Sequence, residues 1–299
     1  MDVADDQQTG FVVGAGLVAH VPTMVLPEDV RRELNDGREI SLVPGLHRMK
    51  SEQLDPLAID TIIVFDAHWA TTVEFVVSAQ ARRHGLYTSD ELPRGMARVP
   101  YDIPGDPELA ALIGDEVTAA GSWMTPIDDE HLPIHYPTVN LLPFLQGSER
   151  WISVSTAQTA ESDDFLLVGA AIGRAVARSG RRVVLLASGA MSHTFWKLKE
   201  LRAHESSDPV HIRTPEARAA DLERVAWLEE GEHRKVVDTM PEFLRFHPEA
   251  MFGHYLMMVG AIGGRDCTAP GVAYSEYENA IGTGQIHLWF PCPPSGWTA

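Results

Sequence analysis

The stretch TIIVFDAHWA, residues 61–70, begins like a buried strand and ends in polar side chains. Its first five residues are apolar, aromatic or β-branched, which is typical of a strand covered on both faces. Asp66, His68 and Trp69 then follow within four positions. An acid, an imidazole and an indole at the tip of a core strand require an explanation beyond packing.

Similar strand patterns recur along the chain, with helical patterns between them. The further expected strands are residues 11–20, 151–157 and 181–188, and the expected helices are residues 106–121, 163–180, 215–231 and 248–264. This alternation predicts an α/β protein with a mainly parallel, mixed central sheet flanked by helices. In such sheets the active site lies at the carboxyl ends of the strands.

The remaining segments favour one domain over residues 1–299. Residues 22–55 and 78–106 are rich in Pro and Gly, and we expect them to form long functional loops. Residues 1–10 are polar and acidic, and we expect a flexible N-terminal tail there.

The composition excludes several kinds of partner. Acidic residues outnumber basic ones by 42 to 24, and the formal net charge of −18 repels phosphate backbones and anionic lipids. No apolar run approaches the ~18 residues of a membrane span, and the acidic start is unlike a signal peptide. Cys267 and Cys292 lack the CxxC spacing of a zinc knuckle. We therefore expect a cytoplasmic protein that binds neither nucleic acid nor membranes.

Three histidines and a glutamate each follow an apolar run: His20, His68, His193 and Glu276. A single histidine of this kind is more often a hydrogen-bonded structural residue than a ligand, and a single glutamate is usually solvated. Two imidazoles and a carboxylate together, however, form the facial triad of non-haem Fe(II). The same donors also form catalytic zinc sites. The residues therefore predict a metal site and leave the metal open.

Short motifs surround these residues. They are HVP at 20–22, DAHW at 66–69, SGAMSH at 188–193, and Glu276 before GTG at 282–284. In this order and spacing, which extends over nearly the whole chain, they resemble class III extradiol ring-cleaving dioxygenases, the protocatechuate 4,5-dioxygenase superfamily. GLYTSDELP at 85–93 and GDPELAALI at 105–113 are similar to its 3,4-dihydroxyphenylacetate 2,3-dioxygenase branch.

The resemblance implies roles for individual residues. His20, His68 and Glu276 match the Fe(II) ligands of the family, and His193 matches its acid–base histidine. Tyr136 matches a position that contacts substrate or oxygen. The implied reaction inserts both atoms of O2 beside the diol of a small aromatic substrate, most like 3,4-dihydroxyphenylacetate. The product is a ring-opened semialdehyde of aromatic catabolism, and we expect a homo-oligomer, either a dimer or a tetramer.

Residues beside these positions have two interpretations each. Asp66 lies two positions before His68, so it could accept a hydrogen bond from the imidazole of a metal ligand, or it could cap the following turn. Around Tyr136 relatives carry an acid and then Gly, whereas this chain has HYPT at 135–138, with His131 close by. His131 and His135 could contact the substrate, by recognising a carboxylate or admitting a different ring, or they could lie on a surface loop.

Three alternatives remain. The same chemistry could act on a 2-aminophenol or a dihydroxypyridine, since either can chelate iron. The GAGLVA stretch at 14–19 matches a dinucleotide fingerprint and would indicate an NAD-dependent oxidoreductase. Pro22, however, would break the required helix, so we interpret these glycines as a closely packed strand. A non-catalytic partner subunit is disfavoured because all three ligands and His193 are present.

Overall fold

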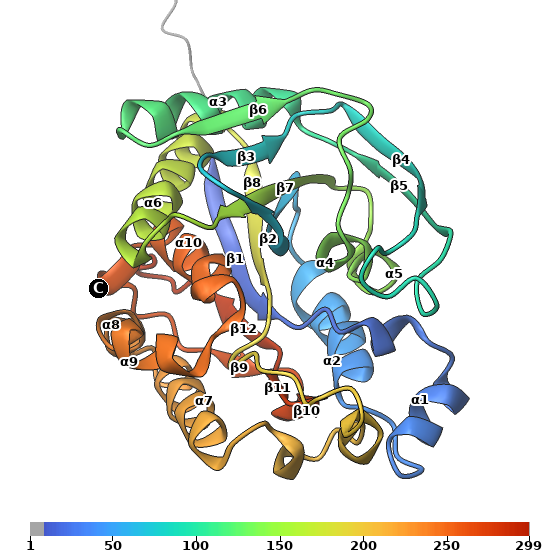
Figure 1. The fold of residues 1–299 in the computed structure, drawn as a ribbon. Helices are drawn as coiled ribbons and strands as arrows, with labels where there is room; N and C mark the ends of the chain where they lie inside the picture. The colour runs from blue at the N-terminus through green and yellow to red at the C-terminus, as the bar shows by residue number, and fades with distance from the viewer. Residues whose placement is uncertain (1–8, 299) are drawn as a thin grey trace, which may run out of the picture.

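The central sheet is built around the four strands that the sequence predicts. The computed structural model describes residues 9–298 and is drawn in Figure 1. The predicted strands are β1 (Phe11–Val18), β2 (Thr61–Thr71), β7 (Arg150–Ala157) and β8 (Arg182–Ser188). β2 runs parallel to both β7 and β8, and β8 runs parallel to β1. The carboxyl ends of these strands therefore meet at one edge of the sheet.

Four shorter strands extend this parallel centre to a mixed sheet of eight strands, in the order β6-β3-β7-β2-β8-β1-β12-β9. They are β3 (Phe75–Ser78), β6 (Met124–Ile127), β9 (Val272–Ala273) and β12 (Leu288–Pro291). β12 pairs antiparallel with β1, and β3 pairs antiparallel with β7. The prediction of an α/β protein with a mainly parallel, mixed sheet is confirmed.

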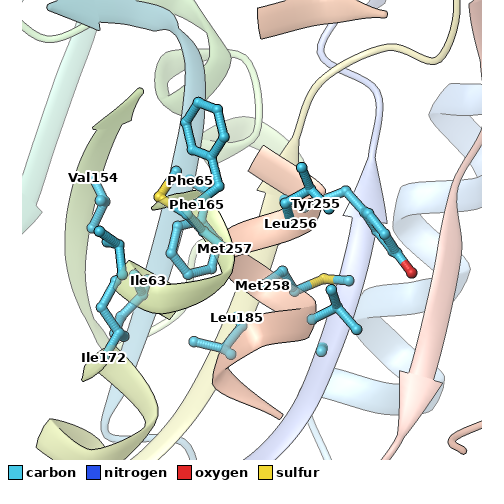
Figure 2. Close-up of a cluster of buried hydrophobic side chains, with 14 of the residues drawn as sticks. Ile63, Phe65, Val154, Phe165, Ile172, Leu185, Tyr255, Leu256, Met257 and Met258 are labelled. Atoms are coloured by element: carbon cyan, nitrogen blue, oxygen red, sulfur yellow. The ribbon is translucent and has the colours of Figure 1, made fainter. Parts of the chain in front are cut away.

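Both faces of β2 are buried because its alternate side chains enter different hydrophobic clusters. Ile63 and Phe65 pack toward α6 (Ser162–Ser179) and α10 (Gly253–Ala261), as Figure 2 shows. Ile62 and Val64 face the cluster that includes α2 (Leu42–Met49), α4 (Tyr136–Val139) and α5 (Leu142–Leu145). In Figure 1 these two groups of helices lie on opposite sides of the sheet.

The helix ends follow the capping signals in the sequence. Asp106 accepts a hydrogen bond from the backbone of Leu109 at the start of α3 (Pro107–Ala119). α6 ends at Gly180, which adopts a left-handed conformation with φ 67°. The other α-helices are α1 (Glu28–Leu34), α7 (Pro215–Glu229), α8 (His233–Asp238) and α9 (Met240–Phe243).

Two expected loops contain more regular structure than the sequence suggested. Residues 22–55 include α1 and α2, together with a 3₁₀ turn at Pro22–Val25 and a π turn at Lys50–Leu54. Residues 78–106 contain the antiparallel hairpin of β4 (Arg82–Tyr87) and β5 (Val99–Pro104). Proline and glycine obscured these elements, since both residues weaken helix and strand patterns without excluding them.

The glycines of GAGLVA lie inside β1 and not in a strand-to-helix turn. A Cβ atom on Gly14 would lie 2.2 Å from Cζ2 of Trp289, so only glycine fits against this indole. β1 ends at Val18, and a four-residue 3₁₀ turn follows at Pro22–Val25. The interpretation as a closely packed strand is confirmed.

At the N-terminus, the expected tail of residues 1–10 lies mostly outside the described residues. Gly10, which is described, is buried and donates a hydrogen bond to the carbonyl of Ala177, at 3.0 Å. Among the helices of residues 9–298, none has the length and apolar character needed to span a membrane.

Candidate metal centre and active site

Two of the predicted ligands meet a third residue at the carboxyl edge of the sheet. His20 follows β1, His68 lies in β2, and Glu249 precedes α10. One ligand atom from each lies within 4.8 Å of the others. Oε1 of Glu249 is 2.7 Å from Nε2 of His68 and 3.5 Å from Nε2 of His20.

The carboxylate of this cluster is Glu249 and not Glu276, which corrects the sequence-based assignment. Glu276 is exposed, and its backbone N–H donates to Oγ of Ser41. It follows β9, a two-residue strand at the outer edge of the sheet, separated from β1 by β12. A short strand precedes Glu276 as expected. This strand lies two positions away from β1 in the sheet, so Glu276 does not reach the histidines.

Glu249 is held by backbone contacts from the segment after β8. The N–H of Ala190 donates to its Oε2 at 2.5 Å, and its own N–H donates to the carbonyl of Met191 at 3.2 Å. The next three residues, Ala250, Met251 and Phe252, have φ values of 46°, 58° and 61°. Non-glycine residues in this left-handed region cost about 1–3 kcal/mol each. The chain thus reaches α10 through a strained turn that presents Glu249 to the histidines.

The sequence contained a signal for Glu249 that a helical interpretation concealed. Residues 248–264 were expected to form one helix, in which an acid near the start only complements the helix dipole. In the structure α10 begins at Gly253, and its residues from Gly253 to Gly260 are all buried. A helix that is apolar all round lies inside the protein. The acid just before it is therefore buried too, and a buried carboxylate needs partners.

His20 is oriented so that one ring nitrogen faces the cluster. Its Nδ1 lies 3.0 Å from Oγ of Ser188, the last residue of β8, while Nε2 faces Glu249. Its backbone carbonyl accepts a hydrogen bond from Asn140 at 2.7 Å. Ligating histidines usually have such a partner on the second nitrogen, because it fixes the tautomer and the ring orientation.

The partner on the second nitrogen of His68 is Glu91, which the sequence analysis did not identify. Oε1 of Glu91 lies 2.8 Å from Nδ1 of His68. Glu91 belongs to the segment between β4 and β5, which lines the cavity beside the cluster. Its place in the DELP stretch, far from His68 in sequence, gave no indication of this contact.

Asp66 takes the capping role. Its Oδ1 accepts hydrogen bonds from the backbone of His68 and Trp69, at 3.1 and 3.0 Å, and Oδ2 accepts one from Thr138. The pairing of β2 with β7 shifts between Asp66 and Ala70, so residues 67–69 form a bulge. Bulges re-aim side chains at sites beside a sheet. Asp66 thus stabilises the bulge that carries His68 and does not touch its imidazole.

His193 and Tyr136 lie beside the cluster and line the same cavity. Nε2 of His193 is 3.5 Å from Oε1 of Glu249, and burial lowers the pKa of this imidazole. The hydroxyl of Tyr136 is 2.6 Å from Nε2 of His68. Burial, together with nearby carboxylates such as Glu249, raises the pKa of Tyr136. The phenol therefore keeps its proton and the His193 imidazole is neutral near neutral pH, so one can donate a hydrogen bond and the other can accept a proton.

His131 and His135 do not line this cavity. His131 is exposed, with its ring 3.6 Å from the carboxylate of Glu130. His135 stacks on Trp69 with ring centroids 5.9 Å apart and an interplanar angle of 28°. Trp69 is buried and packs as expected. The two extra histidines therefore lie apart from the candidate site.

The pKa values in the cluster reflect strong mutual attraction. Burial disfavours the charged form of His68, but the nearby carboxylates of Glu249 and Glu91 outweigh it and raise the pKa to about 10. Burial would also raise the pKa of Glu249, but His193 and His20 hold it well below its usual range. Glu249 is therefore a carboxylate at neutral pH, surrounded by three imidazoles.

The cluster fits a divalent transition metal. Although Oε1 of Glu249 lies close to the imidazole nitrogens, it makes no hydrogen bond of acceptable geometry within the described residues. A buried carboxylate oxygen without a partner is costly. A metal ion bound by this oxygen and two imidazoles would remove that cost, and this donor set suits Fe(II) or Zn(II).

A cavity of about 870 Å³ opens beside the cluster. Residues of the cluster and its neighbours line one part of it: His20, Tyr136, His193 and Glu249. The other walls come from residues 21–42, from the segments 91–95 and 195–207, and from the hairpin of β10 (Glu278–Ala280) and β11 (Thr283–Gln285). A ligand in the cavity can therefore reach the candidate metal centre.

The chain is similar to known ring-opening dioxygenases. A family model described as the catalytic LigB subunit of aromatic ring-opening dioxygenase matches residues 14–286. The chain is 29% identical to 3,4-dihydroxyphenylacetate 2,3-dioxygenase of Escherichia coli, over 85% of this chain and 91% of that protein. It is 22% identical to the 2-aminophenol 1,6-dioxygenase beta subunit of a Pseudomonas species, over 92% of each.

A solved structure has the same fold. It is the crystal structure of an uncharacterized protein of Escherichia coli K12, with a TM-score of 0.63 and 16% sequence identity. The match covers 93% of this chain and 99% of that one.

Proposed function

We propose a function for this chain from the family to which it belongs, the catalytic LigB subunits of aromatic ring-opening dioxygenases. The proposed reaction is cleavage of a catechol at an Fe(II) centre held by His20, His68 and Glu249. The chain is an extradiol ring-cleaving dioxygenase. The observation that supports the metal centre is the convergence of two imidazoles and one carboxylate, all three within 4.8 Å.

The chain's own residues can orient a substrate and move its protons. Bound at this cluster, Fe(II) would supply open positions for the diol and for O2, together with charge transfer between them. His193 lines the cavity as a neutral imidazole and can take the proton that the catechol loses. Tyr136 can donate a hydrogen bond to the substrate or to oxygen. The opened ring would be released as a semialdehyde.

The names of the relatives suggest two classes of substrate. One relative is a 3,4-dihydroxyphenylacetate 2,3-dioxygenase, which supports a dihydroxyphenylacetate-like catechol as the first compound to test. Another is the beta subunit of a 2-aminophenol 1,6-dioxygenase, which supports 2-aminophenols as the alternative. We also keep dihydroxypyridines in the panel because they can chelate iron in a similar way.

The other two alternatives receive less support. The GAGLVA glycines lie within β1, so no helix N-terminus is available there for a dinucleotide phosphate. A non-catalytic partner subunit would not need an intact set of two histidines, one glutamate and a cavity-lining His193. We propose a cytoplasmic homo-oligomer, a dimer or tetramer, which light scattering of the purified protein would test.

The decisive experiment is anaerobic reconstitution with Fe(II), followed by oxygen uptake with catechols, 2-aminophenols and dihydroxypyridines. We expect uptake with at least one class and a coloured ring-opened product. No uptake by iron-loaded protein with any compound would contradict the proposal. A His193→Ala variant should keep its iron and lose turnover, whereas loss of iron from this variant would show that His193 has a different role.

A further inference from the structure

The cavity is larger than a simple catechol requires. Its volume of about 870 Å³ is near the upper end of the about 300–1,000 Å³ usual for drug-sized ligands. A single ring with an acetate arm fills only part of such a space. If the ring binds at the proposed metal centre, on which this inference rests, the remaining volume must hold a longer arm or stay wet.

The walls away from the cluster are mainly apolar. They include Leu26, Leu34, Ile40, Leu42 and Ile281. Ile40 and Leu42 are buried, and the others are partly buried. An apolar arm placed against these side chains would be stabilised by the removal of apolar surface from water.

Most polar groups in these walls already have partners within the protein. Arg31 binds both carboxylate oxygens of Glu39, at 2.8 and 3.0 Å, and its remaining nitrogen donates to the carbonyl of Leu26. The amide of Asn279 donates to two carbonyls and accepts the N–H of Gly282. These side chains hold the walls together and are not free to recognise a ligand.

Glu278 differs from these groups. It is the first residue of β10, it lines the cavity, and only 4% of its surface is exposed. Oε1 accepts the backbone N–H of Ser41 at 2.7 Å, but Oε2 has no hydrogen-bond partner within the described residues. A buried carboxyl oxygen without a partner is unfavourable, because it has lost its hydrogen bonds to water. A donor on a ligand would remove this cost.

We infer that the substrate is a catechol with an elongated, mainly apolar arm that ends in a hydrogen-bond donor held by Glu278. The donor is a hydroxyl, an amide or an ammonium group. Burial raises the pKa of Glu278 to about 7, so near neutral pH the side chain is populated in both its neutral and its ionised form. Both forms can accept a hydrogen bond from a donor, whereas a carboxylate arm would bring a second negative charge to the ionised form.

A rival cation lies on the cavity wall at Arg94. Arg94 is exposed and forms no ion pair with any residue that the structure describes. If the arm of the substrate were a carboxylate, Arg94 would be its natural partner. The inference therefore makes opposite predictions for substitutions at Glu278 and at Arg94.

The test uses catechols whose three-carbon arms differ only in the terminal group: carboxylate, methyl, hydroxyl, amide or ammonium. Dissociation constants are measured anaerobically by calorimetry on metal-loaded protein, and KM by oxygen uptake. For the wild-type chain we expect the hydroxyl, amide or ammonium arm to bind about tenfold or more tightly than the carboxylate arm. Ratios between two ligands on one preparation are independent of how much of that preparation is folded.

Matched variants assign the preference to a residue. In Glu278→Leu, the dissociation constants of the donor-arm and methyl-arm compounds should become nearly equal. Glu278→Gln should keep part of the preference for the hydroxyl arm and lose the preference for ammonium. Glu205→Gln, which removes an exposed acid from the same cavity, is the control and should leave these ratios unchanged.

Two results would overturn the inference. In the first, the wild-type chain binds the carboxylate arm more tightly than the other arms, and Arg94→Gln loses this preference. In the second, Glu278→Leu still prefers the arms that end in a donor. The proposed function fails separately. A Glu278-dependent binding preference without oxygen uptake for any catechol would support the inference about the arm and contradict the dioxygenase chemistry.

Discussion

Two buried glutamates line the same cavity, and their surroundings shift their pKa values in opposite directions. Three imidazoles surround Glu249, and they keep its pKa well below the usual range although burial acts in the other direction. Glu278 has one backbone N–H as a partner and no nearby cation among the causes of its shift, so burial, aided by the carboxylates of Glu276 and Glu39, raises its pKa to about 7. The difference shows that neighbouring charges, and not burial alone, decide whether an acid in this cavity is ionised.

This difference also separates two tasks within one cavity. An acid that is always ionised suits metal binding, because a metal ligand must be deprotonated. An acid that titrates near neutral pH and has a free oxygen suits hydrogen bonding to a neutral or cationic group. The cavity can therefore offer both a metal ligand and a hydrogen-bond acceptor to one substrate.

The largest expected effect comes from removing the carboxylate at the cluster. Glu249→Gln replaces one of three donors, so metal affinity should fall by more than the about 10–100-fold typical of removing an outer partner. Ring cleavage should be lost with the metal. Metal content after dialysis, measured by mass spectrometry, checks the result.

The matched control for this change is Glu276→Gln. Glu276 is exposed and lies outside the cluster, so this variant should bind metal and turn over like the wild-type chain. Metal loss in Glu276→Gln with metal retained in Glu249→Gln would restore the assignment made from the sequence.

Next in size is the effect of Glu278 on stability. A glutamate with a pKa of 4.5 when unfolded and about 7 when folded keeps its proton longer in the native state. Between these pH values the unfolded chain binds fewer protons, so the free energy of unfolding falls as pH rises. Above pH 7 the free energy of unfolding is lower by the full amount, on the order of 3 kcal/mol. Glu278→Gln cannot titrate and should lack this loss.

Denaturant unfolding of both proteins at pH 5 and pH 8 measures this difference. Other titrating groups contribute equally to the two chains, so the variant should gain stability relative to wild type only at the higher pH. An equal difference at both pH values would mean that Glu278 is ionised in the folded chain, like Glu249.

A smaller effect is expected at Glu91, the outer partner of His68. Glu91→Gln keeps the size of the side chain but removes the carboxylate 2.8 Å from Nδ1 of His68. Metal affinity should fall by about 10–100-fold, because the imidazole loses its orienting acceptor and some basicity. Competitive titration of Co(II) against a chelator checks this value. Glu130→Gln, at an exposed acid outside the cavity, should leave the affinity unchanged.

Much of the fold was predictable because it depends on local patterns. The four central strands, the helix starting after Asp106 and the helix ending at Gly180 all carry short-range signals. The hairpin of β4 and β5 was not predicted, since its stability depends on packing across the chain and its residues include Pro and Gly. Pattern alone therefore found the centre of the sheet but not the elements that cover the site.

The site divides in the same way. His20 follows β1 and His68 lies near the end of β2, and the alternation of elements implies that these strands are parallel, so their meeting at one edge was predictable. Glu249 depends on a left-handed turn, and Glu91 on a long segment folding back over His68. The contact of Glu91 has no local sequence signal, and the signal for Glu249 is only the apolar run of α10 that follows it. Glu276 could have been excluded as a metal ligand only by knowing that β9 is the outermost strand of the sheet, and the sequence does not reveal this.

The smallest effect is expected at the histidine that the structure places outside the cavity. The side chain of His131 is exposed and its ring lies beside Glu130, so His131→Ala should change stability by no more than about 0.5 kcal/mol, as is usual for surface positions. KM for the best catechol, and its ratio between carboxylate and hydroxyl arms, should also stay the same. If His131→Ala weakened binding of the carboxylate-arm compound alone, His131 would have to lie over the cavity during turnover. Recognition of the arm would then come from a mobile cation, and Glu278 would lose its assigned task.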